Sequence, residues 1–213
     1  MACSLRHEKR LWRTGLACVA GIDEAGRGPL AGPVIVAAVV LPQNFRLAGL
    51  DDSKRLDPIK RLRVFEALMR CDRVIWNVAE RTHEDIDRVN ILQATHEAMR
   101  EAVFTLQLTV EHALVDGLAV PRFPCHHTAL VGGDALSLSI AAASVIAKTF
   151  RDRAMENWHQ HYPIYGFSHH KGYPTPAHLD TLRRYGPCPI HRKSYAPVAQ
   201  AECWRISPHS ARS

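Results

Sequence analysis

The sequence lacks any apolar run long enough to cross a membrane. Its longest run, residues 34–41, holds eight residues, whereas a membrane-spanning helix needs about 20. Basic residues near the N-terminus precede an apolar stretch that Asp23 interrupts, which is not the pattern of a secretory signal peptide. These absences predict a protein that has no membrane association and acts in the cytoplasm.

Closely spaced cysteine pairs are also missing. The six cysteines form no C-x-x-C motif. Cys188 and His191 have the spacing of one pair of zinc ligands, but the sequence offers no second pair to complete a site, so no zinc site is expected. Without an export signal, we expect the cysteines to stay as thiols in a reducing compartment.

The common nucleotide and hydrolase motifs are absent or out of context. Neither the Walker sequence G-x-x-x-x-G-K-[ST] nor the elbow G-x-S-x-G occurs. Gly26, Gly28 and Ala31 match the dinucleotide fingerprint G-x-G-x-x-A, but Pro29 and Pro33 lead into a strand. Because that fingerprint must open a helix, we reject a Rossmann site.

Positive charge is concentrated at the two ends of the chain. The net charge is +6; residues 1–14 hold four basic and one acidic side chain, and residues 183–213 hold six basic and one acidic. The middle of the chain is therefore slightly acidic. This distribution favours a polyanionic ligand whose reacting phosphate lies at carboxylates, although basic tails that only aid solubility would produce it too.

Hydrophobic periodicity predicts a mixed sheet covered by helices. Apolar or alternating runs indicate strands at 18–23, 34–41, 73–79 and 113–116, with a further candidate at 130–131. Helices are predicted at 58–69, from the Thr82 cap onward, at 137–158 and at 176–185. This order is typical of the α/β or α+β classes.

The length of 213 residues suits a single domain. We expect a basic N-terminal extension over 1–17, one catalytic domain over 18–199 and a flexible tail over 200–213. The tail has no hydrophobic periodicity.

Four carboxylates follow apolar strands or glycine turns. Asp23 and Glu24 come at the end of the first predicted strand, Asp116 follows another strand, and Asp134 lies after two glycines. Each alone is more often a turn or cap residue. Strand ends that adjoin in one sheet would gather these charges, and such a cluster needs cations. Oxygen ligands without histidine select Mg²⁺ or Mn²⁺, and carboxylates that hold two such ions are typical of phosphodiester hydrolysis.

Several motifs resemble those of one enzyme family, bacterial type 2 ribonuclease H, or ribonuclease HII. The resemblance runs from about residue 19 to residue 198. The motifs are residues 21–32, 50–56, 86–92, 115–117, 133–148, 165–167, 170–175 and 191–197.

The resemblance implies a ribonuclease H-like fold, with a mixed five-stranded sheet flanked by helices and a helical C-terminal part. It also implies a monomeric endoribonuclease that cuts the RNA strand of RNA–DNA hybrids. Duplex DNA with embedded ribonucleotides would be cut 5′ of the ribonucleotide, by a two-metal mechanism that leaves 3′-hydroxyl and 5′-phosphate ends.

The resemblance also assigns roles to individual residues. The catalytic metal ligands would be Asp23, Glu24, Asp116 and Asp134. The turn Gly26-Arg27-Gly28 would read the ribose, and Tyr173 would pack on the sugar at the RNA–DNA junction. The expected phosphate contacts are Lys54, Lys148, Lys171 and Arg192. Gly132, where many members have lysine, and Leu118, where a polar residue is common, depart from the family pattern.

Two other functions compete with this one. A protein that binds RNA–DNA hybrids without cutting them has no need for four carboxylates. The related type 3 enzyme has an extra N-terminal domain and usually glutamate in place of Asp134, and this sequence shows neither feature.

Overall fold

The computed structural model describes residues 3–50 and 57–206, with side chains up to residue 202. The chain divides into two compact units. The first, here the sheet unit, comprises the described residues of Met1–Ala25, Ile35–Glu80 and Thr95–Phe150. The second, the helical unit, comprises those of Gly26–Val34, Arg81–Ala94 and Arg151–Ser213.

The sheet unit is built on a five-stranded mixed sheet, as predicted. Its spatial order is β3-β2-β1-β4-β5; β1 pairs with β2 antiparallel and with β4 parallel, and β4 pairs with β5 parallel. The strands are β1 (Val19–Ala25), β2 (Val34–Val40), β3 (Ile75–Arg81), β4 (His112–Asp116) and β5 (His126–Leu130). The weak signal at 130–131 was thus the end of a strand that begins at His126.

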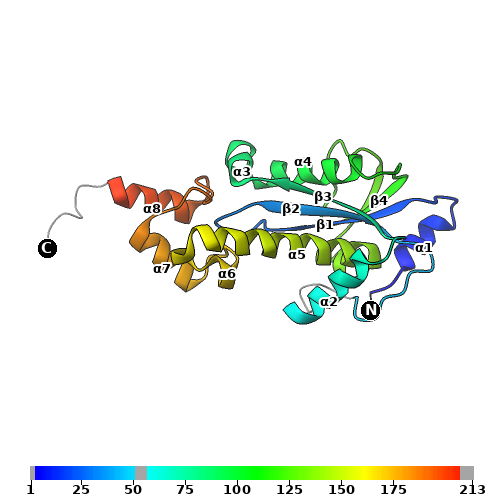
Figure 1. Cartoon of the computed structure of the whole chain (residues 1–213). Coiled ribbons are helices and arrows are strands. Elements are labelled where there is room, and N and C mark those ends of the chain that lie inside the picture. The colour runs from blue at the N-terminus through cyan, green and yellow to red at the C-terminus, as the bar shows by residue number, and fades with distance from the viewer. Residues whose placement is uncertain (1–2, 51–56, 207–213) are drawn as a thin grey trace. The chain divides into compact units, whose positions relative to one another are not determined.

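Helices cover both faces of this sheet (Figure 1). Ala98, Met99 and Ala102 of α4 pack on one face against alternate residues of β1, β2 and β4. Helix α5 approaches the other face so closely that a Cβ at Gly21 would lie 2.1 Å from the Ser139 carbonyl carbon. The helices of this unit are α1 (Arg6–Trp12), α2 (Pro58–Met69), most of α4 (Ile91–Phe104), the short η1 (Gly133–Ala135) and the first half of α5 (Leu138–His161).

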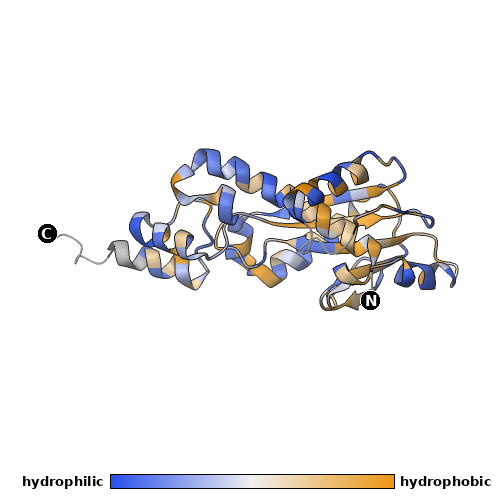
Figure 2. Cartoon of the chain, turned by 90° about the horizontal axis from the view of Figure 1, so that it is seen from below, coloured by the Kyte–Doolittle hydropathy of each residue, from blue (hydrophilic) through white to orange (hydrophobic). Residues whose placement is uncertain are grey.

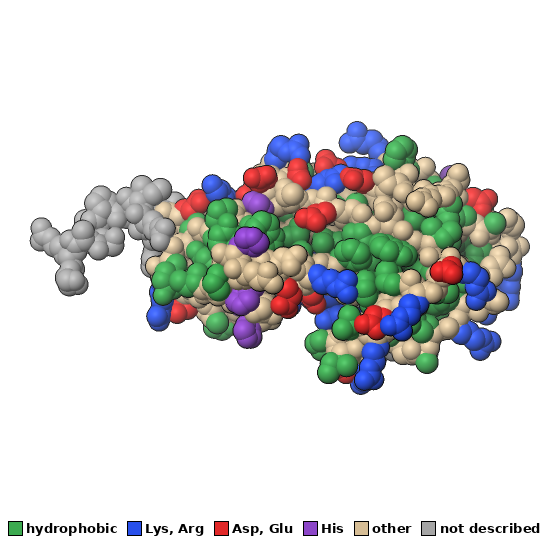
Figure 3. All heavy atoms as spheres, viewed as in Figure 1, with side chains coloured by type: hydrophobic (Ala, Val, Ile, Leu, Met, Phe, Trp, Pro, Cys, Tyr) green, Lys and Arg blue, Asp and Glu red, His purple; other side chains and the backbone are tan. Residues whose placement is uncertain are grey.

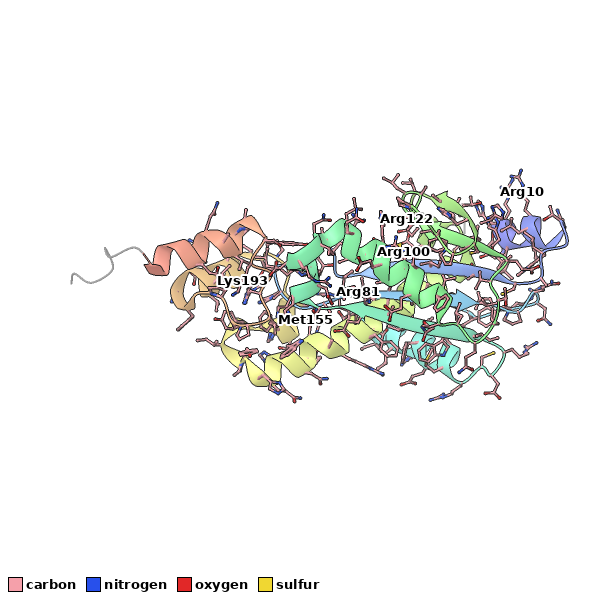
Figure 4. All side chains as sticks on the ribbon, turned by 90° about the horizontal axis from the view of Figure 1, so that it is seen from above. Arg10, Arg81, Arg100, Arg122, Met155 and Lys193 are labelled. Atoms are coloured by element: carbon pink, nitrogen blue, oxygen red, sulfur yellow. The ribbon has the colours of Figure 1, made fainter. Side chains whose placement is uncertain are left out.

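The helical unit has apolar clusters of its own. Met155, on the second half of α5 (Figure 4), packs with Tyr165, Phe167 and Ile190. The helices of this unit carry both hydrophilic and hydrophobic residues (Figure 2). They are α3 (His83–Val89), η2 (Pro163–Tyr165), α6 (Phe167–His170), α7 (Pro176–Tyr185) and α8 (Ala196–Ile206).

The predicted helix after Thr82 is two helices. Thr82 and Asp85 form the expected capping box at the start of α3. Asn90 then adopts a positive φ of 70°, which ends α3, and its side chain accepts a hydrogen bond from the Gln93 amide at the start of α4. Asparagine tolerates this left-handed conformation better than most residues do.

The expectation of a loose tail from residue 200 is wrong for residues 200–206, which continue α8. Val198 and Ala201 on this helix are buried against Leu30 and Leu182. This burial holds a helix that has no periodic signal in the sequence. No helix among the described residues is long and apolar enough to span a membrane.

Candidate active site

Three of the four predicted carboxylates belong to one connected corner of the sheet unit. Ile22 of β1 is aligned with Val115 of the parallel strand β4, so Asp23 and Asp116 follow at neighbouring positions. Asp116 Oδ1 accepts a hydrogen bond of 2.7 Å from the Gly133 amide, and Asp134 is the next residue. The sheet register thus makes Asp23 and Asp116 neighbours, and this bond fixes the residue that precedes Asp134 in the chain.

Asp23 lies on the side of the sheet that faces α5. It is 3% exposed, and it interacts with Ser144 of that helix through a side-chain hydrogen bond. Burial, and then the charges of Glu24 and Asp116, raise the pKa of Asp23 well above its ordinary value, while hydrogen bonds from Ser144 and the Glu24 amide oppose the rise. The elevated pKa shows that this corner disfavours uncompensated negative charge.

Glu24 is half-buried, and its amide donates to Asp23 Oδ1 over 2.7 Å. Because β1 continues to Ala25, regular alternation directs the side chain of Glu24 away from the face that Asp23 occupies. The sequence predicted that the strand ends at Asp23 and Glu24. The structure instead keeps Glu24 beside Asp23 on a regular strand, where its charge still acts on Asp23.

The turn that carries Asp134 depends on glycine. A Cβ at Gly133 would lie 2.6 Å from Ile140 Cδ1 and 3.1 Å from the Leu130 Cβ. Asp134 is only 2% exposed. The absence of a side chain at Gly133 therefore lets the turn sit against α5 and β5.

The donor set of this corner suits hard divalent cations. It offers carboxylate oxygens, the ligands that Mg²⁺ and Mn²⁺ prefer, and burial together with the charges of Glu24 and Asp116 raises the pKa of Asp23, as expected where charge is uncompensated. Within the described residues, no three His, Cys, Asp or Glu side chains are close enough to enclose one ion. Mg²⁺ commonly takes only one or two carboxylates and fills its remaining positions with water and substrate phosphate, so the residues fit this type of ion.

In the helical unit, the turn that follows β1 exposes the predicted ribose-reading residues. Arg27 and Gly28 are exposed, and Gly26 is buried with a φ of 106°. Tyr173 is 42% exposed, and its Cε1 atom would lie 3.6 Å from a Cβ at Gly28. The structure therefore brings the turn and Tyr173 side by side.

The prediction that Arg192 faces phosphates is wrong. Arg192 is 0% exposed, and its guanidinium donates to the carbonyls of Gly26 (2.6 Å), Arg27 (3.0 Å), Gly32 (3.0 Å) and Pro33 (3.1 Å). Buried carbonyls of an irregular loop must find donors, and a planar group with five N–H donors can satisfy several at once. Arg192 supports the turn from behind.

Arg151, which the sequence argument did not single out, has the same role. It is 1% exposed and donates to the carbonyls of Pro33 (3.0 Å), Ala31 (3.2 Å) and Lys171 (3.0 Å). Burial, followed by the charge of Arg192, lowers the pKa of Arg151 to about 10. No local pattern marks this arginine, because its acceptors lie far away in the sequence.

Two buried histidines hold the backbone of Tyr173. His191 Nδ1 accepts from the Cys188 amide over 3.0 Å, so its Nε2 is free to donate to His178 Nε2 over 3.1 Å. His178 Nδ1 then donates to the Tyr173 carbonyl over 2.9 Å. Burial lowers the pKa of His178 to about 4 and that of His191 to about 3, so both rings are neutral near pH 7.

The three predicted lysines have different settings. Lys148 is half-buried on α5, one helical turn beyond Ser144. Lys171 is half-buried and forms an ion pair with Glu156. Lys54 lies outside the described residues. Their contacts with phosphate remain predictions.

Comparisons with known proteins agree with the motifs and the fold. The family model described as Ribonuclease HII matches residues 20–198. The chain is 54% identical over 198 residues to ribonuclease HII of Myxococcus xanthus, covering 92% of this chain and 67% of the relative. It is 49% identical over 194 residues to ribonuclease HII of Chlamydia pneumoniae, covering 91% and 90%.

Solved structures show the same similarity. Ribonuclease H2 from Pyrococcus horikoshii superposes with a TM-score of 0.75 at 29% identity, over 89% of this chain and 99% of that one. A ribonuclease HIII in complex with Mn²⁺ superposes with a TM-score of 0.70 over 89% and 71%, and its 17% identity supports the fold alone.

Proposed function

Because the chain belongs to the ribonuclease HII family, we propose that it cuts RNA in RNA–DNA hybrids and cleaves duplex DNA 5′ of an embedded ribonucleotide. It is an endoribonuclease, not a hybrid-binding protein without activity. The products would carry 3′-hydroxyl and 5′-phosphate ends.

One observation supports the chemistry above all others: the connected corner of Asp23, Asp116 and Asp134. The parallel register of β1 and β4 makes Asp23 and Asp116 neighbours, and the bond from Gly133 to Asp116 fixes the residue before Asp134, which supports this assignment. Burial, and then the charges of Glu24 and Asp116, raise the pKa of Asp23. Bound cations would remove this penalty, so the corner is an energetically reasonable place for divalent metal.

Asp23, Glu24, Asp116 and Asp134 would hold divalent cations, which we take to be two Mg²⁺ or Mn²⁺ ions in the reacting complex. Such ions supply an activated water and stabilise the charge that develops on the phosphate. The protein contributes the placement of the carboxylates. Ser144 orients Asp23 from α5, and the Gly133 amide orients Asp116.

The helical unit would supply recognition of the sugar. A turn with glycine at positions 26 and 28 lets backbone groups approach a 2′-hydroxyl, which is the group that distinguishes RNA from DNA. Tyr173 offers an exposed aromatic ring next to Gly28. Arg151 and Arg192 stabilise this turn, because their guanidinium groups donate hydrogen bonds to the backbone carbonyls of Pro33 and Gly26.

Phosphate contacts would come from separate basic side chains. Figure 3 shows Lys and Arg side chains interspersed with Asp and Glu on the face in view. Lys148, Lys171 and Lys54 are our candidates. We further expect a monomer in the cytoplasm; the five cysteines that the structure describes are free thiols, which fits a reducing compartment.

The test uses three 5′-labelled duplexes: one DNA duplex with a single ribonucleotide, one RNA–DNA hybrid and one all-DNA duplex. We expect cleavage of the first two in Mg²⁺ or Mn²⁺ and none of the third, with product ends identified by ligation. Cleavage must stop when a chelator removes the metal. Binding without cleavage of either RNA-containing duplex, or equal cleavage of all-DNA duplex, would refute the proposal.

A further inference from the structure

Helix α1 lies outside the region that the family model matches, which begins at residue 20. It belongs to the sheet unit and lies beside the beginning of α5 (Figure 1). Three of the four charged residues of this helix are basic, yet its one acidic residue, Glu8, is 0% exposed. A carboxylate is rarely buried completely unless it is paired or hydrogen-bonded, so its contacts are informative.

All the hydrogen bonds of Glu8 that we identify go to the first residues of α5. Its Oε1 atom accepts from Ser137 Oγ (2.6 Å), Ser139 Oγ (2.6 Å) and the Ser139 amide (3.0 Å). Ser137 Oγ in turn accepts from the Ile140 amide over 3.2 Å. The first amides of a helix have no partner within the helix, and negative charge there is favourable. Glu8 thus caps α5 from a distant part of the chain.

Backbone contacts hold the same stretch on its N-terminal side. The Ser4 amide donates to the Leu136 carbonyl and the Leu138 amide donates to the Ser4 carbonyl, both over 3.3 Å. The Cys3 thiol donates to the carbonyl of Asp134 over 3.6 Å. Cys3, Ser4 and Glu8 therefore contact five residues of the segment, namely Asp134, Leu136, Ser137, Leu138 and Ser139.

Residues 135–139 directly follow Asp134 in the chain, so contacts that hold this segment also restrict the backbone of Asp134. On the other side, the Gly133 amide is bound to Asp116. Asp134 thus lies between the bond to Asp116 and the contacts made by residues 3–8, of which those from Glu8 are the shortest. Loss of the Glu8 carboxylate would leave the longer contacts of Cys3 and Ser4 and would loosen the turn that carries Asp134.

We propose that Glu8 is a positioning residue for the carboxylate of Asp134. The inference rests on the proposed function, because it takes Asp134 as a metal ligand. It adds a residue that the family match does not include, and it makes the N-terminal segment part of the catalytic unit and not an extension of it.

Helix α1 has a second means of attachment that does not involve Glu8. Leu11 and Trp12 pack against Val19, Leu114 and Ile140. In addition, the buried Oε2 atom of Glu8 has no hydrogen-bond partner within the described part of the chain, and an unsatisfied buried carboxylate oxygen is unfavourable. Variants at Glu8 should therefore fold.

The experiment compares Glu8→Ala and Glu8→Gln with the wild-type chain. Mn²⁺ alone is titrated without substrate, with free Mn²⁺ followed by electron paramagnetic resonance. Hydrogen exchange of residues 134–140 is measured in metal-free buffer. Loss of an outer-shell partner typically weakens metal binding by tenfold or more, so we expect Glu8→Ala to raise the Mn²⁺ dissociation constant about tenfold and to speed exchange of the Ser139 amide.

Glu8→Gln keeps an oxygen acceptor and should lose clearly less affinity than Glu8→Ala. If Glu8→Ala fails to fold, Glu8→Gln is used alone. Faster exchange of its Ser139 amide together with weaker Mn²⁺ binding supports the inference, and wild-type values of both contradict it. The matched control is Glu111→Gln. Glu111 also accepts two backbone hydrogen bonds, from Ala17 and Cys18 at 2.7 Å each, but it supports the start of β1. Its loss should leave Mn²⁺ binding unchanged.

Wild-type Mn²⁺ affinity and exchange in Glu8→Ala, with only a lower melting temperature, would overturn the inference. Failure of the proposed function has a different signature, because the wild-type chain itself would then neither bind Mn²⁺ nor cut the substrate. Asp134→Asn serves as the positive control for the loss of a ligand.

Discussion

Gly26 and Gly28 allow the architecture of the turn to be separated from its proposed recognition role. A Cβ at Gly26 would lie 2.1 Å from Arg151 Nε and 2.6 Å from the Pro33 carbonyl oxygen, at a φ of 106°. A Cβ at Gly28 would meet only Tyr173, at an ordinary 3.6 Å. The two alanine substitutions therefore add the same methyl group with very different structural consequences.

For Gly26→Ala we expect a loss of about 3 kcal/mol in the free energy of unfolding. A side chain in this φ range costs about 1–3 kcal/mol, and overpacking adds about 1–3 kcal/mol. Arg151 cannot easily move aside, because its guanidinium is bound to three carbonyls. For a chain of 213 residues the melting temperature should fall by about 6–12 °C.

For Gly28→Ala we expect a melting temperature within about 2 °C of the wild type, since an exposed substitution without strain costs at most about 0.5 kcal/mol. Cleavage of a duplex with one ribonucleotide should still fall about fivefold to thirtyfold. The methyl group would interrupt one backbone contact with the 2′-hydroxyl, worth about 1–2 kcal/mol.

The assay is calorimetry of both variants together with single-turnover cleavage of the same labelled duplex. Gly28→Ala that cuts at the wild-type rate would show that the turn does not read the sugar by close approach. Gly26→Ala with an unchanged melting temperature would refute the rigid packing of Arg151 behind the turn.

Four further outcomes are expected. Asp116→Asn should nearly abolish cleavage and should not destabilise the metal-free protein, because it removes one charge that raises the pKa of Asp23; normal turnover would contradict its role as a ligand. The free energy of unfolding should decline as pH falls from about 6.5 toward 4. His178 and His191 have pKa values of about 4 and about 3 in the folded protein, so over this range the unfolded chain binds protons that the folded chain does not. Urea titrations of His178→Gln should show a shallower decline with pH, and the same decline as in the wild type would count against the neutral pair. Tyr173→Ala should lower the cleavage rate about tenfold to a hundredfold on a duplex with a single embedded ribonucleotide and less on a long hybrid, whereas Tyr173→Phe should have a smaller effect. Equal losses of cleavage rate by Tyr173→Ala on both substrates would exclude a role at the junction. A plot of log affinity against log salt for catalytically inactive protein on hybrid should be linear, with a slope of about −0.9 per phosphate contact, and it should become less steep in Lys171→Ala; a flat plot would exclude electrostatic contacts.

Local features of the sequence were sufficient for most of the secondary structure. Proline at the start of α2 and the capping box of Thr82 act within one helical turn, and both are present as predicted. The strands that carry Asp23 and Asp116 could likewise be located, because a continuous apolar run needs no distant partner to be recognised. The family resemblance then identified the fold and the enzyme class.

Tertiary structure decided which polar groups are buried and what they contact. Arg192 reads as a basic residue near a basic end, yet it is buried against carbonyls up to 166 residues away. Glu8 reads as part of a charged extension, yet it caps a helix 131 residues later. Residues 200–206 are helical because Val198 and Ala201 on the same helix are buried against Leu30 and Leu182. A short sequence pattern reports neighbours within a few residues, whereas the burial of a charge depends on donors and acceptors that only the folded chain brings together.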